Sequence, residues 1–472
     1  MKNKISACIL AAALALPVAA QELRSTYFMQ TSNNRHEMNP ALLDSSYVSM
    51  PLFMGNLNIG STGNFGLANF VYKMQPGWQG YGVDNRNLTT FMHPSVDAGD
   101  FLGDLKDNNR MSLNLKYGLV AVAFKAFKGT NIVELNLRSN TNVNLPKQLF
   151  AFMKEAGKNE SYDISDLGIR TENFLEIGLG HSHKINDKIT VGGKMKFLLG
   201  IAYADFSADN LHVQMQGDQW AISGQPKLSA AILKSEFTHE NNNPSGKIDG
   251  IDDVTFGLPG FGLAFDLGAT YKVLDDLTIS AAITDLGFIK WKNNTTGRMG
   301  MEPWSFKGFN DIAINPDENS SNQNDIEDQL EDMGDDLEEC INFGKVGETG
   351  TRSTMLGATL NLGAQYTLPM YKGLRFGFLS STYINGAYSW SEGRFSANIV
   401  PCKWFDASVN YSISSFGSSL GWLISLHPKG FGLYIGSDYQ FFKVTPQFVP
   451  VNHVNANINL GITFPLGKYK KI

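Results

Sequence analysis

The stretch FLEIGLGHSHKINDKITVGGKMKFLLGI, residues 174–201, alternates apolar and polar positions on both sides of an Asn-Asp turn. Successive side chains of a β-strand point to opposite faces. One face of the first half therefore carries Ile177, Leu179, His181, His183 and Ile185. The other carries Glu176, Gly178, Gly180, Ser182 and Lys184. After the turn, an apolar row from Ile189 to Ile201 opposes Thr190, Gly192, Lys194 and Lys196. The pattern predicts a hairpin of two long strands.

The same alternation recurs in residues 263–273, 405–414 and 454–464. Soluble strands usually have about five to six residues, whereas a tilted strand needs about 9–11 residues to cross a bilayer. The apolar rows of these segments contain no Lys, Arg, Asp or Glu, as a lipid-facing surface requires. Gly, Ser, Asn and Lys on the opposite rows suit a wet lumen. The sequence therefore predicts an all-β fold, a transmembrane antiparallel β-barrel.

The predicted barrel spans residues 47–472 and has about fourteen strands. A further hairpin within residues 203–260 would give sixteen. The predicted strands are 47–60, 111–125, 130–143, 172–184, 188–202, 261–273, 277–290, 354–368, 372–390, 393–400, 404–415, 418–427, 430–442 and 453–466.

The connections between these strands alternate between long and short. The long ones follow the first, third, fifth and seventh strands and comprise residues 61–110, 144–171, 203–260 and 291–353. All four therefore fall on the same side of the membrane. Outer-membrane barrels have long loops outside and short turns in the periplasm, so the alternation supports the barrel and gives its orientation.

The first twenty residues predict export. Lys2 and Lys4 precede the apolar run Ile5–Leu16, and Val18-Ala19-Ala20 forms a small-residue cleavage site. Cleavage would remove two lysines and change the formal charge from −6 to −8. This acidic balance, without a basic run, argues against nucleic acid as a partner. The predicted location is the outer membrane, among membrane lipids and lipopolysaccharide.

Asn39-Pro40-Ala41, ahead of the first strand, resembles the plug motif of the long-chain fatty acid transporter (FadL-like) superfamily of outer-membrane barrels. Residues 262–291 resemble the Asp-x-Gly hairpins of that superfamily and of its relative in the type IX secretion system. The overall pattern looks most like a group of Bacteroidota outer-membrane proteins assigned to the same superfamily. The resemblance implies an N-terminal plug in residues 21–46 and passage of fatty-acid-like hydrophobic molecules. The alternative function is a docking or shuttle barrel with a secretion-system partner.

Four charged residues of the opening hairpin share the predicted lumen face: Glu176, Lys184, Lys194 and Lys196. A cationic patch could receive the polar head of a hydrophobic ligand. The same charges could instead pair across strands and keep the lumen wet. The sequence predicts no cofactor, no metal site and no catalytic residue.

Several weaker motifs have simpler interpretations. The GSSLG match at Ser419 lies between two predicted strands, whereas a nucleophile elbow needs a strand, a turn and a helix. His181 and His183 could share a metal ion, but their place near the end of an apolar row favours a membrane-interface girdle. The acidic segment 317–339 predicts an amphipathic helix in an outer loop, and its start only partly matches a calcium loop. Cys340 and Cys402 are too few for a disulfide framework.

Overall fold

The computed structural model describes residues 23–50, 56–78, 88–155, 158, 160–208, 210–216, 219–224, 226–232, 234–239, 248–255, 258–301, 341–345, 350–439 and 455–466. The predicted signal peptide and the acidic segment 317–339 with Cys340 lie outside these residues. Within them, no helix combines the length and apolar character that crossing a membrane requires.

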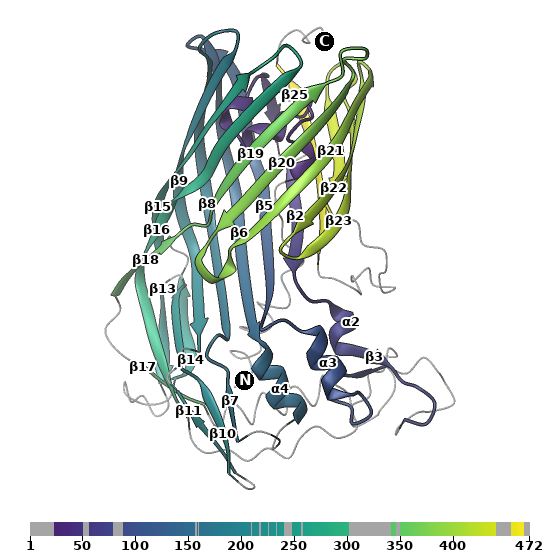
Figure 1. The fold of residues 1–472 in the computed structure, drawn as a ribbon. Helices are drawn as coiled ribbons and strands as arrows, with labels where there is room; N and C mark the ends of the chain where they lie inside the picture. The colour runs from purple at the N-terminus through teal and green to yellow at the C-terminus, as the bar shows by residue number, and fades with distance from the viewer. Residues whose placement is uncertain are drawn as a thin grey trace, which may run out of the picture.

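Fourteen antiparallel strands form a closed barrel wall, as predicted (Figure 1). β25 pairs with both β1 and β2, which join the last wall strand to the first. β1 and β2 share their two neighbours and make one wall strand, and β18 and β19 likewise follow one another along β16. The wall strands are β1 (Tyr47–Ser49) with β2 (Leu57–Gly63), β5 (Asn108–Ala126), β6 (Gly129–Pro146), β8 (Gly168–Lys184), β9 (Ile189–Ser207), β15 (Gly260–Lys272), β16 (Leu277–Met301), β18 (Gly350–Met355) with β19 (Ala358–Thr367), β20 (Leu374–Ile384), β21 (Trp390–Cys402), β22 (Phe405–Ser414), β23 (Gly417–Leu426), β24 (Gly432–Ser437) and β25 (Ala456–Pro465).

The two faces of the wall follow the predicted alternation. On β15, Phe265 and Leu267 are 46% and 58% exposed, while Asp266 between them is fully buried. Other wall strands show the same contrast, with exposed apolar side chains outside and buried polar ones inside. A charged side chain at the centre of the lipid face would cost about 2–4 kcal/mol, which explains why charges are confined to the lumen. The wall is therefore built like that of a transmembrane β-barrel.

A bulge interrupts the alternation where β15 meets β16. The pairing register shifts between Phe265 and Leu267, and Asp285 has a φ of 60°. The backbone N–H of Asp285 donates to Asp266 Oδ1 at 2.8 Å. Beyond the bulge, the residues of β16 that point inward are the odd-numbered ones, so that Ile289 and Trp291 are buried inside the barrel. The sequence pattern did not predict this bulge.

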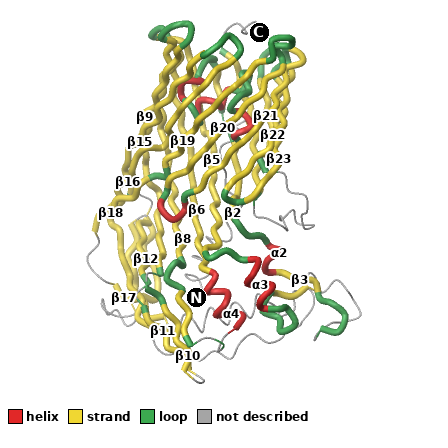
Figure 2. Tube along the Cα trace, in the orientation of Figure 1, coloured by secondary structure: helices red, strands yellow, loops and turns green. Residues whose placement is uncertain are grey.

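The two ends of the barrel differ. Short turns lie at one end, and helices and additional strands gather at the other (Figures 1 and 2). Strand β12 pairs with the outer ends of β9 and β16 and so extends the wall, rather than adding a hairpin that crosses it. The additional elements are α2 (Leu67–Phe70), β3 (Val71–Lys73), β4 (Leu88–Thr90), α3 (Ala98–Asp104), α4 (Lys147–Glu155), β7 (Ser161–Asp163), β10 (His212–Gln216), β11 (Gln219–Ser223), β12 (Lys227–Ile232), β13 (Lys234–His239), β14 (Ile248–Thr255) and β17 (Ile341–Lys345).

Candidate functional site

Residues 23–46, here called the N-terminal segment, lie inside the end of the barrel that carries the short turns (Figure 1). The segment contains three short 3₁₀ turns, η1 (Arg24–Thr26), η2 (Asn33–Glu37) and η3 (Pro40–Leu42). Most of its residues are buried, including charged ones. Buried polar groups need partners, and the barrel wall supplies many of them.

The Asn39-Pro40-Ala41 motif forms the entry to η3. Asn39 is the N-cap, and its Oδ1 accepts the N–H of Ala41 at 3.0 Å. Pro40 takes the first helical position, where its missing N–H costs nothing. The Nδ2 of Asn39 donates to Tyr27 Oη at 3.1 Å, and Ser182 Oγ on β8 donates to the carbonyl of Ala41 at 3.3 Å. The motif therefore shapes its own turn and fixes that turn to the wall.

Two glycines of the wall make room for this turn. Gly192 on β9 and Gly268 on β15 are paired in register. A Cβ on Gly192 would lie 2.3 Å from the backbone N of Ala41, and one on Gly268 would lie 2.1 Å from Asn39 Oδ1. Real Cβ atoms do not come so close to other atoms, so only glycine allows the turn to rest on the wall. Alternation along the strand predicts that Gly192 lies on the lumen face, but no local pattern predicts its contact with the turn.

The middle of the N-terminal segment is held by charges. Lys194 on β9 binds Glu134 on β6 at 2.6 Å and donates to His36 Nδ1 at 3.3 Å. Since Nδ1 accepts, the Nε2–H of His36 donates to Tyr47 Oη, at 2.7 Å. Glu37, the next residue, forms an ion pair with Lys116 on β5 at 3.1 Å. These contacts attach η2 to three different parts of the wall.

A second buried network lies beside this one and crosses five strands. Lys196 Nζ is 2.8 Å from Asp266 and 2.6 Å from Asp285. Arg138 binds Asp285 at 2.9 Å and Glu176 at 2.8 Å. The structure thus brings together the predicted residues Glu176, Lys194 and Lys196. It adds Glu134, Arg138, Asp266 and Asp285. The alternation within each strand indicates that these side chains point inward, but it does not predict which of them lie next to one another.

Lys184 does not join these residues, so its predicted place in the lumen patch was wrong. Its Nζ binds Asp187 in the adjoining turn at 2.7 Å, and its side chain is 61% exposed. The reason is that Lys184 is the last residue of β8. There the strand leaves the barrel interior, and alternation no longer decides which groups a side chain meets.

A third attachment holds the start of the N-terminal segment on the opposite wall. Arg24 forms an ion pair with Glu392 on β21 at 3.1 Å, and its guanidinium lies 4.2 Å from the centre of the Trp390 ring. The backbone N–H and the hydroxyl of Ser25 both donate to Asp438, which follows β24. Arg394 joins the two carboxylates, at 2.8 Å from Glu392 and 3.2 Å from Asp438.

A small cavity of about 80 Å³ adjoins the N-terminal segment. Its lining is mostly polar and amide-rich. Three cations contribute, and Leu356 and Trp390 are among its apolar members. The lining residues are Arg24, Met38, Ser112, Asn114, Leu115, Lys116, Arg138, Asn140, Asn142, Asp285, Leu356, Gly357, Thr359, Asn361, Tyr383 and Trp390.

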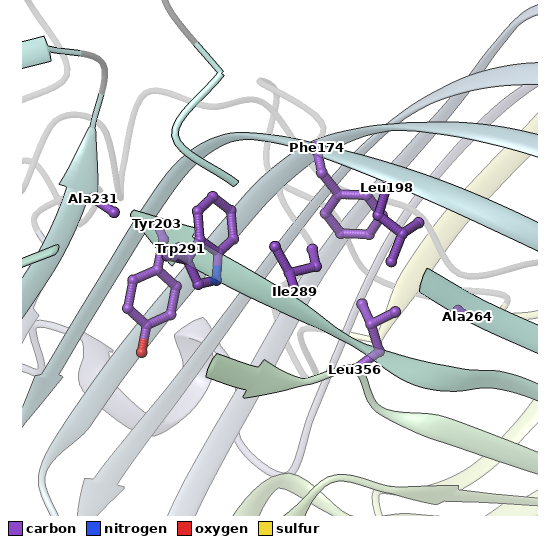
Figure 3. Close-up of a cluster of buried hydrophobic side chains, with 8 residues drawn as sticks. All are labelled: Phe174, Leu198, Tyr203, Ala231, Ala264, Ile289, Trp291 and Leu356. Carbon is purple, nitrogen blue, oxygen red and sulfur yellow. The ribbon is translucent and has the colours of Figure 1, made fainter. Parts of the chain in front are cut away.

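An apolar cluster inside the barrel borders this cavity through Leu356 (Figure 3). Trp291 stacks on Tyr203 with ring centres 5.3 Å apart, and its Nε1–H donates to Thr354 at 2.9 Å. The indole lies close over Gly200 and Gly260, since a Cβ on either glycine would come within 2.8 Å of it. The cluster consists of Phe174, Leu198, Tyr203, Ala231, Ala264, Ile289, Trp291 and Leu356.

Arg138 joins the polar and apolar parts of the interior. Its guanidinium lies 5.3 Å from the centre of the Phe174 ring, and the residue also lines the cavity. The apolar cluster therefore lies within a few ångströms of a charged and amide-lined space. Such a gradient suits a molecule with an apolar body and a polar end.

The remaining sequence motifs occupy ordinary structural positions. Ser419 lies in β23 directly after a hairpin turn, and its hydroxyl is 2.7 Å from that of Ser412 on β22. The rings of His181 and His183 stack on the outer face with centres 5.7 Å apart. Among the described residues, no group of His, Cys, Asp and Glu side chains has the arrangement of a metal site.

His36 leads to a prediction about acid stability. Burial, together with the neighbouring Lys194, lowers the pKa of His36 to about 3, whereas a histidine in the unfolded chain titrates near pH 6.5. Between about pH 6.5 and pH 3 the unfolded state therefore binds the extra proton, so the free energy of unfolding falls as the pH decreases. We expect His36→Gln, which can still donate to Tyr47, to lose stability less steeply. Urea unfolding of both proteins at pH 7 and pH 4 measures this, and parallel losses would contradict it.

The chain has no match among curated protein sequences. Solved structures with a similar fold include the toluene transporters TbuX of Ralstonia pickettii (10% identity, 91% of this chain and 92% of that chain, TM-score 0.42) and TodX of P. putida (10% identity, 93% and 95%, TM-score 0.41). A FadL homologue of Pseudomonas aeruginosa is also similar (10% identity, 91% and 93%, TM-score 0.38). At these scores the likeness carries no functional detail.

The family assignment rests on sequence. Residues 40–438 match the model of a family that is described as a family of unknown function, DUF5723. The match begins at Pro40 of the Asn-Pro-Ala motif and continues through β24, so it includes nearly the whole barrel wall. The protein belongs to this family.

Proposed function

We propose that this protein is an outer-membrane transport barrel that passes small hydrophobic molecules with a polar end, such as fatty acids, and that the N-terminal segment is its plug. The observation that carries the proposal is the junction inside the barrel. There the apolar cluster around Trp291 meets the cavity at Arg138, next to the N-terminal segment. A hydrophobic body would lie on the cluster while a polar end met Arg138 and the neighbouring amides.

The size of the cavity implies that the plug must move. Small-molecule sites usually measure about 300–1,000 Å³, whereas this cavity has about 80 Å³. The plug is attached by hydrogen bonds and ion pairs, which water and ions can replace when it moves, and by small apolar clusters such as that of Phe28 with Leu379. Glu176, Lys194 and Lys196 are paired and buried while the plug is in place. In this proposal, Asn39, Pro40 and Ala41 hold the closed arrangement, and displacement of the plug exposes the charged wall to the passing molecule.

A cross-link tests whether the plug must move. The Thr31 hydroxyl donates to Asp406 on β22, so the pair Thr31→Cys and Asp406→Cys can join plug and wall in a chain whose own cysteines are serine. We expect oxidation to stop the uptake of a radiolabelled long-chain fatty acid into proteoliposomes, and reductant to restore it. Each single-cysteine variant serves as a control. Equal uptake by the oxidised and reduced double variant would refute a moving plug.

The alternative function, a docking barrel, is favoured by one observation. The outer connections form a folded cap in which α3 and α4 pack through Phe101 and Phe150, with Phe91 stacked on Phe101 at 4.5 Å. An ordered cap of this kind offers a surface to a protein partner. Purification from the native membrane separates the two functions. A bound lipophilic molecule, identified by mass spectrometry, supports transport, whereas a stoichiometric protein partner with no fatty acid uptake supports docking.

A further inference from the structure

A groove of about 520 Å³ lies on the outer face of the barrel, across strands β5, β6, β8, β9 and β15. At its centre is Gly193, which points outward, since the outward-facing residues Val191 and Met195 flank it at a spacing of two. A Cβ on Gly193 would find no atom closer than 3.7 Å. Exposed apolar side chains form the sides of the groove: Phe124, Val133, Leu179, Met195, Phe265 and Leu267.

The pairing of the strands shows how the chemistry of this surface changes with depth. One outward-facing row, formed by Val133, Leu179, Met195 and Phe265, is entirely apolar. The next row toward the short turns contains Asn131, His181, Gly193 and Leu267. In that row His181 Nδ1 and Asn131 Oδ1 are 2.9 Å apart. The first polar side chains of this surface therefore lie at the level of Gly193, on the side of the groove nearer the periplasm.

A cation lies beyond the polar row. Lys128 is in the turn between β5 and β6 and is exposed. Within the described parts of the chain, it has no carboxylate within 4 Å that could neutralise it. His183 lies next to this turn, because it pairs with Gly129. Along one line the surface thus offers an apolar groove, a hydrogen-bonding pair and an exposed lysine.

We infer that this groove binds one anionic phospholipid of the periplasmic leaflet. An acyl chain fills the space over Gly193, where it contacts Leu179, Met195 and Leu267. The phosphate lies at the level of His183 and Lys128, at the boundary between the apolar belt and water. Lysines near an anionic lipid surface attract it, and buried methylene groups add to the affinity. The order of groups from apolar to cationic matches the order along such a lipid.

A matched pair of glycine substitutions tests the inference. Gly193→Leu fills the groove, whereas Gly393→Leu adds the same side chain at an outward position on β21, where the nearest atom would be 3.6 Å away. Both sites have room, so both variants should fold, which heat-shifted migration on gels can confirm. The proteins are reconstituted with equal phosphatidylglycerol and phosphatidylcholine, released into mild detergent, and weighed intact by native mass spectrometry.

We expect the wild type and Gly393→Leu to retain one phosphatidylglycerol. Gly193→Leu should retain about tenfold less, because the acyl chain loses its contacts. The variant Lys128→Gln should still bind lipid but lose its preference for phosphatidylglycerol, by about tenfold. Equal retention by the two leucine variants would overturn the inference, as would equal retention of the two lipids by the wild type. If a fatty acid displaced the phosphatidylglycerol, the inference would also be overturned and the groove would be assigned to the transported molecule. If the protein proved not to transport fatty acids, the proposed function would fail but this inference would not.

Discussion

Replacing Gly192 with valine will displace the N-terminal segment and open the barrel to small polar solutes. The new Cβ would lie 2.3 Å from Pro40 C and Ala41 N, and these are backbone atoms that cannot rotate away. Overpacking of a buried contact costs about 1–3 kcal/mol and occasionally more. The strands on either side are paired along their length, so the short 3₁₀ turn moves before the wall does. A lumen rich in Asn and Ser will then fill with water and conduct ions.

Conductance in planar bilayers measures this effect, with limited proteolysis of the N-terminal segment as a second readout. Gly393→Val is the matched control, because it adds the same side chain to an outward position that has room. We expect a low conductance for the wild type and Gly393→Val, and a high one for Gly192→Val with faster cleavage of the segment. If Gly192→Val conducts and resists protease like the wild type, the glycine does not hold the turn in place.

The comparison of Gly192 with Gly193 shows how much of this site the sequence could predict. Strict alternation on β9 places Gly192 on the lumen face and Gly193 on the lipid face, and the structure agrees. The sequence also predicted the fourteen-stranded wall, because the alternation that marks each strand lies within that strand. It could not show that Pro40 and Ala41 rest on Gly192. That contact joins segments that lie far apart in the sequence, and no local pattern encodes it.

The charged network illustrates the same limit. Glu176, Lys194 and Lys196 were placed on one face because they belong to one hairpin. Their partners Arg138 and Asp285 come from other strands, and Asp285 sits in a bulge that reverses the alternation of β16. Register across strands and the position of a bulge depend on tertiary packing. The error over Lys184 has the related cause that alternation does not say where a strand ends.

Replacing Lys196 with methionine will cause a large loss of stability. The ammonium group is almost fully buried between Asp266 and Asp285, at 2.8 and 2.6 Å. Arg138 still pairs with Asp285 in the variant, but Asp266 has no second ion pair among the described residues, because its cross-strand neighbour Lys194 is paired with Glu134. Removing one partner of a buried ion pair costs about 3–5 kcal/mol, because the remaining charge stays buried without compensation. We expect a loss of this size in the free energy of unfolding.

Urea titration in lipid vesicles, followed by tryptophan fluorescence, measures that loss through the shift in midpoint. Lys184→Met is the control within the same hairpin, since the exposed pair of Lys184 with Asp187 lies in water, and its midpoint should not move. The double variant Lys196→Met, Asp266→Asn removes the stranded charge, while the amide oxygen of the new side chain can still accept the N–H of Asp285. It should recover most of the lost stability. If the double variant is as unstable as Lys196→Met alone, the loss comes from packing around the lysine stem and not from an uncompensated carboxylate.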